Sequence, residues 1–308
     1  MMQKKNKWIT TRRDFLKTTG GVLIGLSTGT LLAQEKRTRI KKLISFGMVT
    51  DPHSADVEAK ESRYYKESVS KMAECVELMN DKKVDFLIEL GDFKDMDDTE
   101  SAENALKYLD SIESVFKKFE GPAYHVIGNH DVDCISKEQF LNRVENTGIS
   151  KDASYYSFDA KGLHFIVLDA NYLSDGSDFN SGNYVWTDVN IPEKEMNWLK
   201  NDLASTSKPV VVFVHELLDG QGDLYVNNAK EIRQVLQKHQ NVLAVFQGHH
   251  HSGDFNLIND IYYYTLKAMV EGSGSSNSSY AIVDVYEDYS IAITGYRKAE
   301  NKNLSYTE

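Results

Sequence analysis

Cysteine and proline are scarce in this chain of 308 residues, and basic residues are fewer than acidic ones. Two cysteines cannot build a disulfide framework, and four prolines give no basis for a long, stiff or flexible linker. The net charge of −11 makes the chain a poor general binder of nucleic-acid phosphates, so we expect no nucleic-acid partner. With 41% hydrophobic residues the composition is that of a globular protein, which excludes disorder and fibrous classes.

The first 33 residues predict a targeting segment. Six Lys and Arg residues precede a short apolar run from Gly20 to Ala33, which is too short to cross a membrane comfortably. Residues 11–17 (TRRDFLK) resemble the twin-arginine export signal, with the pair at Arg12 and Arg13. The resemblance implies export by the twin-arginine machinery to the periplasm or another extracytoplasmic place, with no stable membrane span after removal of the signal. An uncleaved N-terminal anchor is the alternative.

Apolar, strand-like runs alternate with amphipathic stretches through the rest of the chain. Strands are predicted at residues 43–50, 84–90, 124–127, 155–158, 163–168, 210–214 and 242–246, and further strands from 261 onward. Helices are predicted at residues 64–80, 102–119, 193–203 and 229–239. This alternation indicates an α/β fold.

Polar residues of the kinds that bind metals follow five of these strands directly. In chain order they are Asp51-x-His53, Gly91-Asp92-x-x-Asp95, Gly128-Asn129-His130-Asp131, His215 and Gly248-His249-x-His251. Ligands in α/β folds bind at the carboxyl ends of strands, so we expect these side chains to meet. They are too many for one tetrahedral ion, and a mixed Asp, Asn and His set suits two divalent ions such as Mn, Fe or Zn.

This ordered series of five motifs resembles the calcineurin-like metallophosphoesterase superfamily. The resemblance covers residues 51–251 and implies one domain over residues 34–308, an α/β sandwich of two mixed β-sheets flanked by helices. It assigns metal binding to seven residues, in two sets joined by a shared carboxylate: Asp51, His53 and His251 for the first ion, Asn129, His215 and His249 for the second, and Asp92 for both. It further implies that His130 faces the substrate and assists the leaving oxygen, and that Asp95 orients His130.

Residues beside the motifs narrow the reaction and the substrate. Met96-Asp97 stands where protein Ser/Thr phosphatases carry Arg-Gly, which argues against that branch of the family. Asp95 stands where purple acid phosphatases carry a Tyr ligand, which argues against their iron–tyrosinate site. The run from Arg63 to Ser68 (RYYKES) resembles the manganese-dependent ADP-ribose/CDP-alcohol diphosphatase group. It implies a small, nucleotide-like phosphorylated substrate, with Arg63 meeting a second phosphate, although a plain helix start is the alternative. Lys267, in the loop after the last motif, is a further candidate for substrate binding, against a plain connection between strands.

The sequence therefore predicts an exported, dinuclear-metal hydrolase of phosphodiester or pyrophosphate bonds. The resemblance implies in-line attack by a hydroxide that bridges the metals. The alternatives are a phosphomonoesterase that scavenges phosphate and a catalytically silent metal- or ligand-binding protein. The polar segment over residues 173–190, with Tyr184 and Trp186, would shape the substrate pocket if it lies beside the site, and it is either a lid or plain surface.

Overall fold

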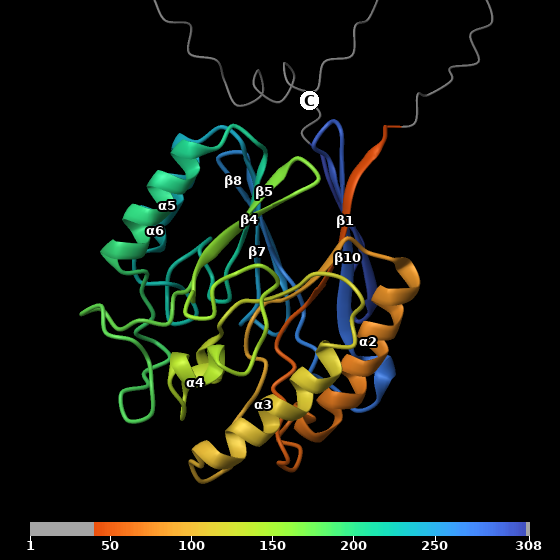
Figure 1. The fold of residues 1–308 in the computed structure, drawn as a ribbon, viewed down its shortest axis with the longest axis vertical. Helices are drawn as coiled ribbons and strands as arrows, with labels where there is room; N and C mark the ends of the chain where they lie inside the picture. Colours follow the sequence, from red (N-terminus) through yellow and green to blue (C-terminus); the bar gives the residue numbers. More distant parts are fainter. Residues whose placement is uncertain (1–39, 306–308) are drawn as a thin grey trace, which may run out of the picture.

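Two six-stranded β-sheets pack face to face with helices outside them (Figure 1). The computed structural model describes residues 40–305, so the predicted signal peptide and its twin-arginine motif lie outside the described residues. Within residues 40–305, no helix combines the length and the apolar character needed to cross a membrane.

The first sheet is mixed, with a parallel half and an antiparallel half. In spatial order its strands are β12 (Lys302–Leu304), β11 (Ile291–Arg297), β10 (Ser279–Tyr286), β1 (Lys42–Val49), β2 (Phe86–Glu89) and β3 (Ala123–His125). β1 pairs in parallel with β2, and β2 with β3, whereas β10 runs antiparallel to β1. The carboxyl ends of β1, β2 and β3 therefore lie at one edge of the sandwich.

The second sheet is also mixed and supplies the other half of that edge. In spatial order its strands are β4 (Tyr156–Ala160), β5 (Leu163–Val167), β6 (Val210–Phe213), β7 (Val242–Gln247), β9 (Ile261–Thr265) and β8 (Asp254–Ile258). β5, β6, β7 and β9 are parallel, and the outer strands β4 and β8 are antiparallel to their neighbours.

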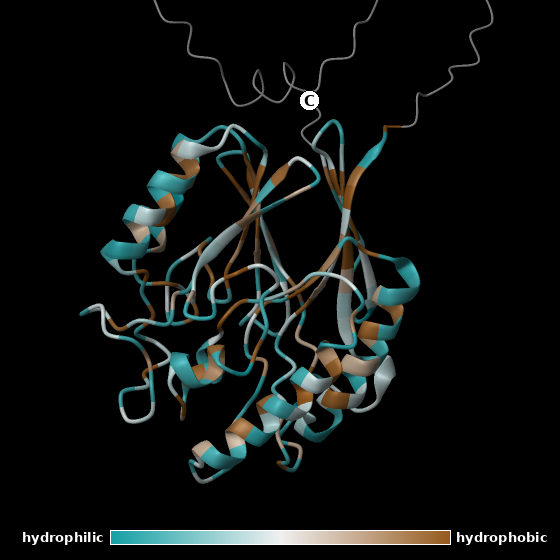
Figure 2. Ribbon diagram, viewed as in Figure 1, coloured by the Kyte–Doolittle hydropathy of each residue, from teal (hydrophilic) through white to brown (hydrophobic). Residues whose placement is uncertain are grey.

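The helices cover the outer faces of the two sheets. Their bounds are α2 (Ser68–Lys82), α3 (Ala102–Phe116), α4 (Lys137–Leu141), α5 (Glu193–Ser205) and α6 (Ala229–Lys238). The apolar faces of α2 and α3 pack on the first sheet, and those of α5 and α6 on the second (Figures 1 and 2). Gly47 in β1 permits the close approach of α2, because a Cβ there would lie 2.6 Å from the sulfur of Met79. The helices show brown, apolar residues alternating with teal, polar ones, as amphipathic helices do (Figure 2).

The core between the sheets is rich in phenylalanine. The ring of Phe46 in β1 lies 5.8 Å from those of Phe165 and Phe213 and 6.0 Å from that of Phe246, all on the second sheet. These edge-to-face contacts join the two sheets and fix their strand ends relative to one another. The predicted fold class, an α/β sandwich of two mixed sheets flanked by helices, is confirmed.

Candidate active site

Three of the predicted ligands meet where β1 and β7 end. Nε2 of His53 lies 3.7 Å from Oδ1 of Asp51 and 3.1 Å from Nε2 of His251, and Nε2 of His251 lies 3.5 Å from the same Oδ1. A cation with bonds of about 2.1 Å holds neighbouring ligand atoms about 3.0–3.6 Å apart. These three atoms therefore fit one metal ion.

A second group forms where β2, β6 and β7 end. Nε2 of His215 lies 3.1 Å from Oδ2 of Asp92, and His249 offers a ligand atom within 4.8 Å of both. The same Oδ2 lies 3.4 Å from Nε2 of His53 in the first group. Asp92 thus stands between the two groups, where a carboxylate shared by two ions would lie.

Asn129 is held so that its amide oxygen is free. Its Nδ2 donates a hydrogen bond of 2.7 Å to the hydroxyl of Tyr184, which leaves Oδ1 at the other end of the amide. That Oδ1 is buried and has no hydrogen-bond partner.

Among the described residues, four buried atoms of the predicted ligands have no hydrogen-bond partner, which supports a metal site. Oδ1 of Asp51, Oδ1 of Asn129, Nε2 of His215 and Nε2 of His249 are all buried without a hydrogen-bond partner. Leaving one such atom unsatisfied costs about 1–3 kcal/mol, so four together at one edge are expensive without a ligand. Aspartate, asparagine and histidine atoms in this arrangement fit two divalent cations, and the residues present match the predicted group.

The backbone at the ligands is strained in a way that aims their side chains. Asp51, His53, Asp92 and His249 have positive φ angles of 51°, 45°, 56° and 66°. Non-glycine residues seldom adopt this left-handed region, and such residues cluster at functional sites. Gly128 permits the tight packing, since a Cβ there would lie 2.2 Å from the backbone nitrogen of Asp92.

Asp131, the last residue of the Gly128-Asn129-His130-Asp131 motif, organises the backbone. Its carboxylate accepts hydrogen bonds from the backbone N–H groups of four residues: Asp92, Phe93, Lys94 and Gly128. The motif signalled Asp131, but sequence reasoning gave it no role. The structure shows that it joins the β2 and β3 strand ends.

His130 lies beside the first group without belonging to its closest three atoms. Its ring centroid is 4.8 Å from that of His53, and 26% of its side chain is exposed. Nδ1 of His130 lies 3.4 Å from carboxylate oxygens of both Asp95 and Asp133. The structure places Asp95 next to His130, as the prediction requires, but Asp95 also pairs with Nδ1 of His53 at 3.0 Å.

The charges of the site follow from these contacts. Burial opposes ionisation of Asp51 and Asp92, but the surrounding histidines hold the pKa of both carboxyls below its usual range. Burial, reinforced by His215, lowers the pKa of His249 to about 3, so this imidazole is neutral and ready to bind a metal. Burial opposes protonation of His130, but Asp95 and Asp92 raise its pKa above its ordinary value.

Two ligands are oriented by groups that sequence reasoning did not identify. Glu271 lies 2.6 Å from Nδ1 of His251, and Nδ1 of His215 donates to the carbonyl of Leu90 at 2.8 Å. Each contact turns Nε2 of the imidazole toward the cluster. Glu271 has no sequence signal, because it lies 20 residues beyond His251 and belongs to no motif.

The two predicted substrate-binding residues lie in different places. Arg63 is at the rim of the site, with Nε 4.0 Å from the Glu271 carboxylate and 39% of its side chain exposed. The ammonium of Lys267 instead pairs with Glu300 at 2.6 Å. It lines a separate hollow of about 230 Å³ that contains none of the predicted ligands.

The segment over residues 173–190 borders the site. The ring of Tyr184 lies 6.2 Å from that of His130, and the ring of Trp186 lies 6.2 Å from that of His249. The side chain of Trp186 is 42% exposed. Ser181, in the same segment, donates a hydrogen bond to Glu100 on the neighbouring loop. The segment therefore lies beside the site through Tyr184 and Trp186, and the lid that the sequence allows stays a prediction.

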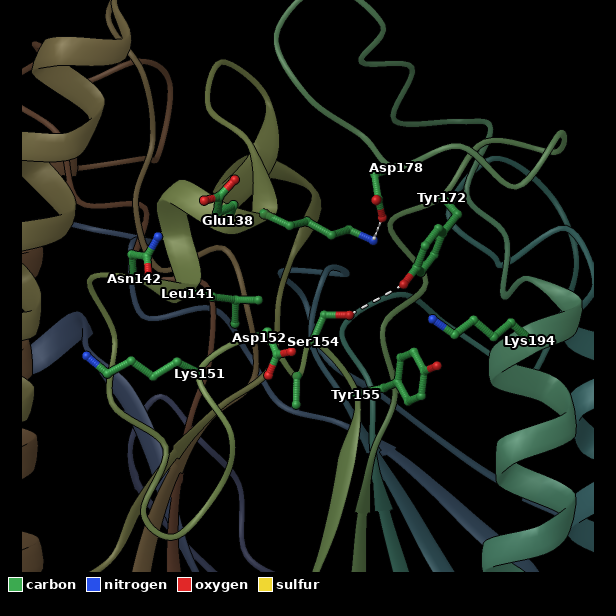
Figure 3. A pocket seen from close by; sticks show the side chains of 12 residues that line it. Glu138, Leu141, Asn142, Lys151, Asp152, Ser154, Tyr155, Tyr172, Asp178 and Lys194 are labelled. Carbon is green, nitrogen blue, oxygen red and sulfur yellow. Dashed lines mark hydrogen bonds and ion pairs between the residues drawn. The ribbon is translucent and has the colours of Figure 1, made fainter.

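A larger hollow of about 640 Å³ lies between α4, residues 151–155 and the start of α5 (Figure 3). Lys137 crosses it, with its ammonium 2.8 Å from Asp178 and 3.1 Å from the centre of the Tyr172 ring. None of the predicted ligands lines this hollow. Three lysines and three carboxylates line it, so its side chains carry no net charge that would favour an anionic or a cationic ligand.

Comparison with known families and structures agrees with this geometry. A family model described as calcineurin-like phosphoesterase matches residues 44–253, a range that includes every predicted ligand. A crystal structure of a dimetal phosphatase from Danio rerio superposes with a TM-score of 0.76 at 21% identity, covering 87% of this chain and 100% of that one.

Similar sequences cover nearly the whole chain. The manganese-dependent ADP-ribose/CDP-alcohol diphosphatase of Oryza sativa subsp. japonica is 23% identical over 304 residues, which cover 84% of this chain and 94% of that protein. The protein of the same name from Homo sapiens is 24% identical over 326 residues, with 86% and 94% covered.

Proposed function

Since the chain belongs to the calcineurin-like phosphoesterase family, and is thus a metal-dependent hydrolase of phosphoric ester or phosphoanhydride bonds, we propose that it cleaves phosphodiester or pyrophosphate bonds. The observation that carries the proposal is the pair of ligand groups joined by Asp92, whose Oδ2 lies 3.1 Å from His215 and 3.4 Å from His53. Two ions held by these adjoining groups would suit in-line displacement at phosphorus.

In the proposed reaction, the residues of the chain bind the metal ions, orient His130 and protonate the leaving oxygen. Two divalent ions, held by the two ligand groups, would supply Lewis acidity toward the phosphoryl oxygens and would activate water as the nucleophile. His130 is turned by Asp95 and Asp133, which face its Nδ1 and leave Nε2 for the substrate. From this position His130 donates a proton to the leaving oxygen. Tyr184 accepts a hydrogen bond from the Asn129 amide and leaves its buried oxygen free to bind an ion.

A nucleotide-like diphosphate is the substrate class that we propose. Relatives named as ADP-ribose/CDP-alcohol diphosphatases align with most of the chain. The exposed ring of Trp186 offers a stacking face for a nucleobase, and Arg63 at the rim offers a cation for a second phosphate. Manganese is the ion that those relatives' names specify, and the ligand set accepts it.

The test is a comparison of substrates with the manganese-loaded protein. We expect a higher kcat/KM for bis-(p-nitrophenyl) phosphate than for p-nitrophenyl phosphate, and hydrolysis of ADP-ribose to AMP and ribose 5-phosphate. Removal of metal by a chelator, followed by its return, is the control for metal dependence. A preference for the monoester would instead identify a phosphomonoesterase and contradict the proposal.

We also propose that the protein is exported. The twin-arginine-like motif around Arg12 and Arg13 supports this, followed as it is by a short apolar run. A protein that must fold around metal ions suits a route that carries folded proteins.

A further inference from the structure

We propose that Glu271 is a positioning residue that sets the affinity of the Asp51–His53–His251 group for its divalent cation, and that the buried ammonium of Lys71 holds Glu271 in place. The inference rests on the proposed two-cation site but not on the substrate. Neither residue belongs to a sequence motif of the site.

The contact between Glu271 and His251 fixes the imidazole. The carboxylate lies 2.6 Å from Nδ1, which leaves Nε2 to face Asp51 and His53. A carboxylate on the far nitrogen of a metal-binding histidine fixes the tautomer and increases the basicity of the ligand.

The segment that carries Glu271 is hydrogen-bonded to the strand ends that carry the predicted ligands. The backbone N–H groups of Met269 and Val270 donate to the carbonyls of Thr50 and Asp51, and that of Ala268 donates to the carbonyl of His251. A displacement of residues 268–271 would therefore move Glu271 relative to two of the ligands that it serves.

Lys71 anchors the same segment from α2. Its side chain is fully buried, and its ammonium donates to the carbonyls of four consecutive residues, Met269 to Gly272, at 2.6–3.3 Å. A lysine buried this deeply is rare, because the charge must be desolvated. Four carbonyls around one ammonium offset that cost and fold the segment around the side chain. The path from Lys71 through Glu271 to His251 thus joins α2 to the metal cluster.

The experiment measures Mn²⁺ binding to the metal-stripped full chain by isothermal titration calorimetry. We expect two Mn²⁺ ions per wild-type chain. Glu271→Ala should weaken one of them by about 10–100-fold, the usual cost of losing such an outer contact, and leave the other near its wild-type affinity. Glu271→Gln, which retains an acceptor, should recover part of the loss. Lys71→Met should weaken the same ion.

Two control variants show which ligand group loses affinity for Mn²⁺ and whether the loss is specific to Glu271. His251→Ala should abolish binding of the ion that Glu271→Ala weakens, which identifies the affected group. Glu67→Gln is the matched control, because Glu67 binds Ser273 and the backbone of Gly274 in the adjoining turn without contacting His251. We expect wild-type Mn²⁺ binding from Glu67→Gln.

Two outcomes would overturn the inference. One is wild-type affinity for both ions in Glu271→Ala, and the other is equal weakening of both, which indicates general loosening. Because Glu271 is partly exposed, this variant decides the matter even if Lys71→Met fails to fold. The measurement involves no turnover, so failure to hydrolyse any phosphodiester would overturn the proposed function and leave this inference standing.

Discussion

The imidazole of His130 differs in surroundings from the imidazoles assigned to metal binding. Two carboxylates, of Asp95 and Asp133, lie 3.4 Å from its Nδ1, and a quarter of its side chain reaches the surface of the site. By contrast, His53 and His215 are fully buried with Nε2 toward Asp92. The proposed division of roles, proton transfer by His130 and ion binding by the buried histidines, rests on this difference in exposure and surroundings.

His130→Gln should retain two metal ions and lose turnover. General-acid assistance contributes about 10²–10⁴-fold, so we expect a loss in that range for ADP-ribose and a smaller loss for p-nitrophenyl esters, whose leaving group needs little protonation. Metal content by mass spectrometry and kcat on both substrates check this. Equal, small losses on both substrates would show that His130 has another role.

Residues of the site differed in how far sequence could reveal them. The predicted ligands stand in compact motifs directly after apolar strands, so residue type and spacing identified them as candidates, and the family resemblance supplied their expected roles. Glu271, Lys71 and Asp133 could not be identified in this way, because their roles arise from contacts between segments far apart in the chain. Lys267 follows the last motif, but its ammonium pairs with Glu300 on the C-terminal segment, so its contact with substrate stays a prediction.

At the scale of elements, apolar periodicity predicted most helices and strands. Buried runs such as β1, β6 and β7 and the amphipathic α2 and α3 were found within a few residues of their observed bounds. One α-helix and one strand of the described residues were missed. α4 has only five residues and depends on a capping box between Ser136 and Gln139, and β8 is a polar outer strand with no buried residue.

A histidine outside the site joins three of these elements. His164 in β5 pairs with Asp159 in β4 at 2.9 Å and with Asp202 in α5 at 2.7 Å. Burial opposes its protonation, but the two carboxylates raise its pKa above the ordinary value. Its protonated form therefore stabilises the fold below about pH 6.5, the value expected for an unfolded chain.

His164→Gln should accordingly lower the free energy of unfolding by about 1–2 kcal/mol at pH 5.5. The difference should shrink as the pH rises through the raised pKa of the folded state, where the wild-type imidazole loses its proton. Urea unfolding of the metal-stripped wild type and variant between pH 5 and 9 measures this difference in the free energy of unfolding. His239→Gln is the control with the opposite trend, because burial and Lys238 lower the pKa of His239. A pH-independent difference for His164→Gln would contradict the account.

At the scale of the whole molecule, the sandwich brings five strand ends from two sheets to one edge. The sequence motifs predicted this convergence, since each follows a strand, but the distances between ligand atoms depend on how the sheets pack. The phenylalanine contacts across the core and the positive φ angles at four ligands supply that geometry. Neither could be predicted from local pattern alone.

Export is a property of the whole chain and is tested on it. In a bacterium with an intact twin-arginine pathway, we expect the wild-type protein to accumulate outside the cytoplasm. Replacing both Arg12 and Arg13 with lysine should retain it inside, because the motif depends on the arginine pair. Cell fractionation followed by immunoblotting measures the distribution. Equal export of both forms would remove the twin-arginine assignment.

The central claim is that one carboxylate, Asp92, joins two metal ions in a single catalytic site. The most direct test is the metal content of purified Asp92→Ala beside that of the wild type, after loading with Mn²⁺ and removal of free metal. The account predicts two ions per wild-type chain and close to none in the variant, because each ligand group loses the oxygen that they share. Two tightly bound ions in Asp92→Ala would contradict it.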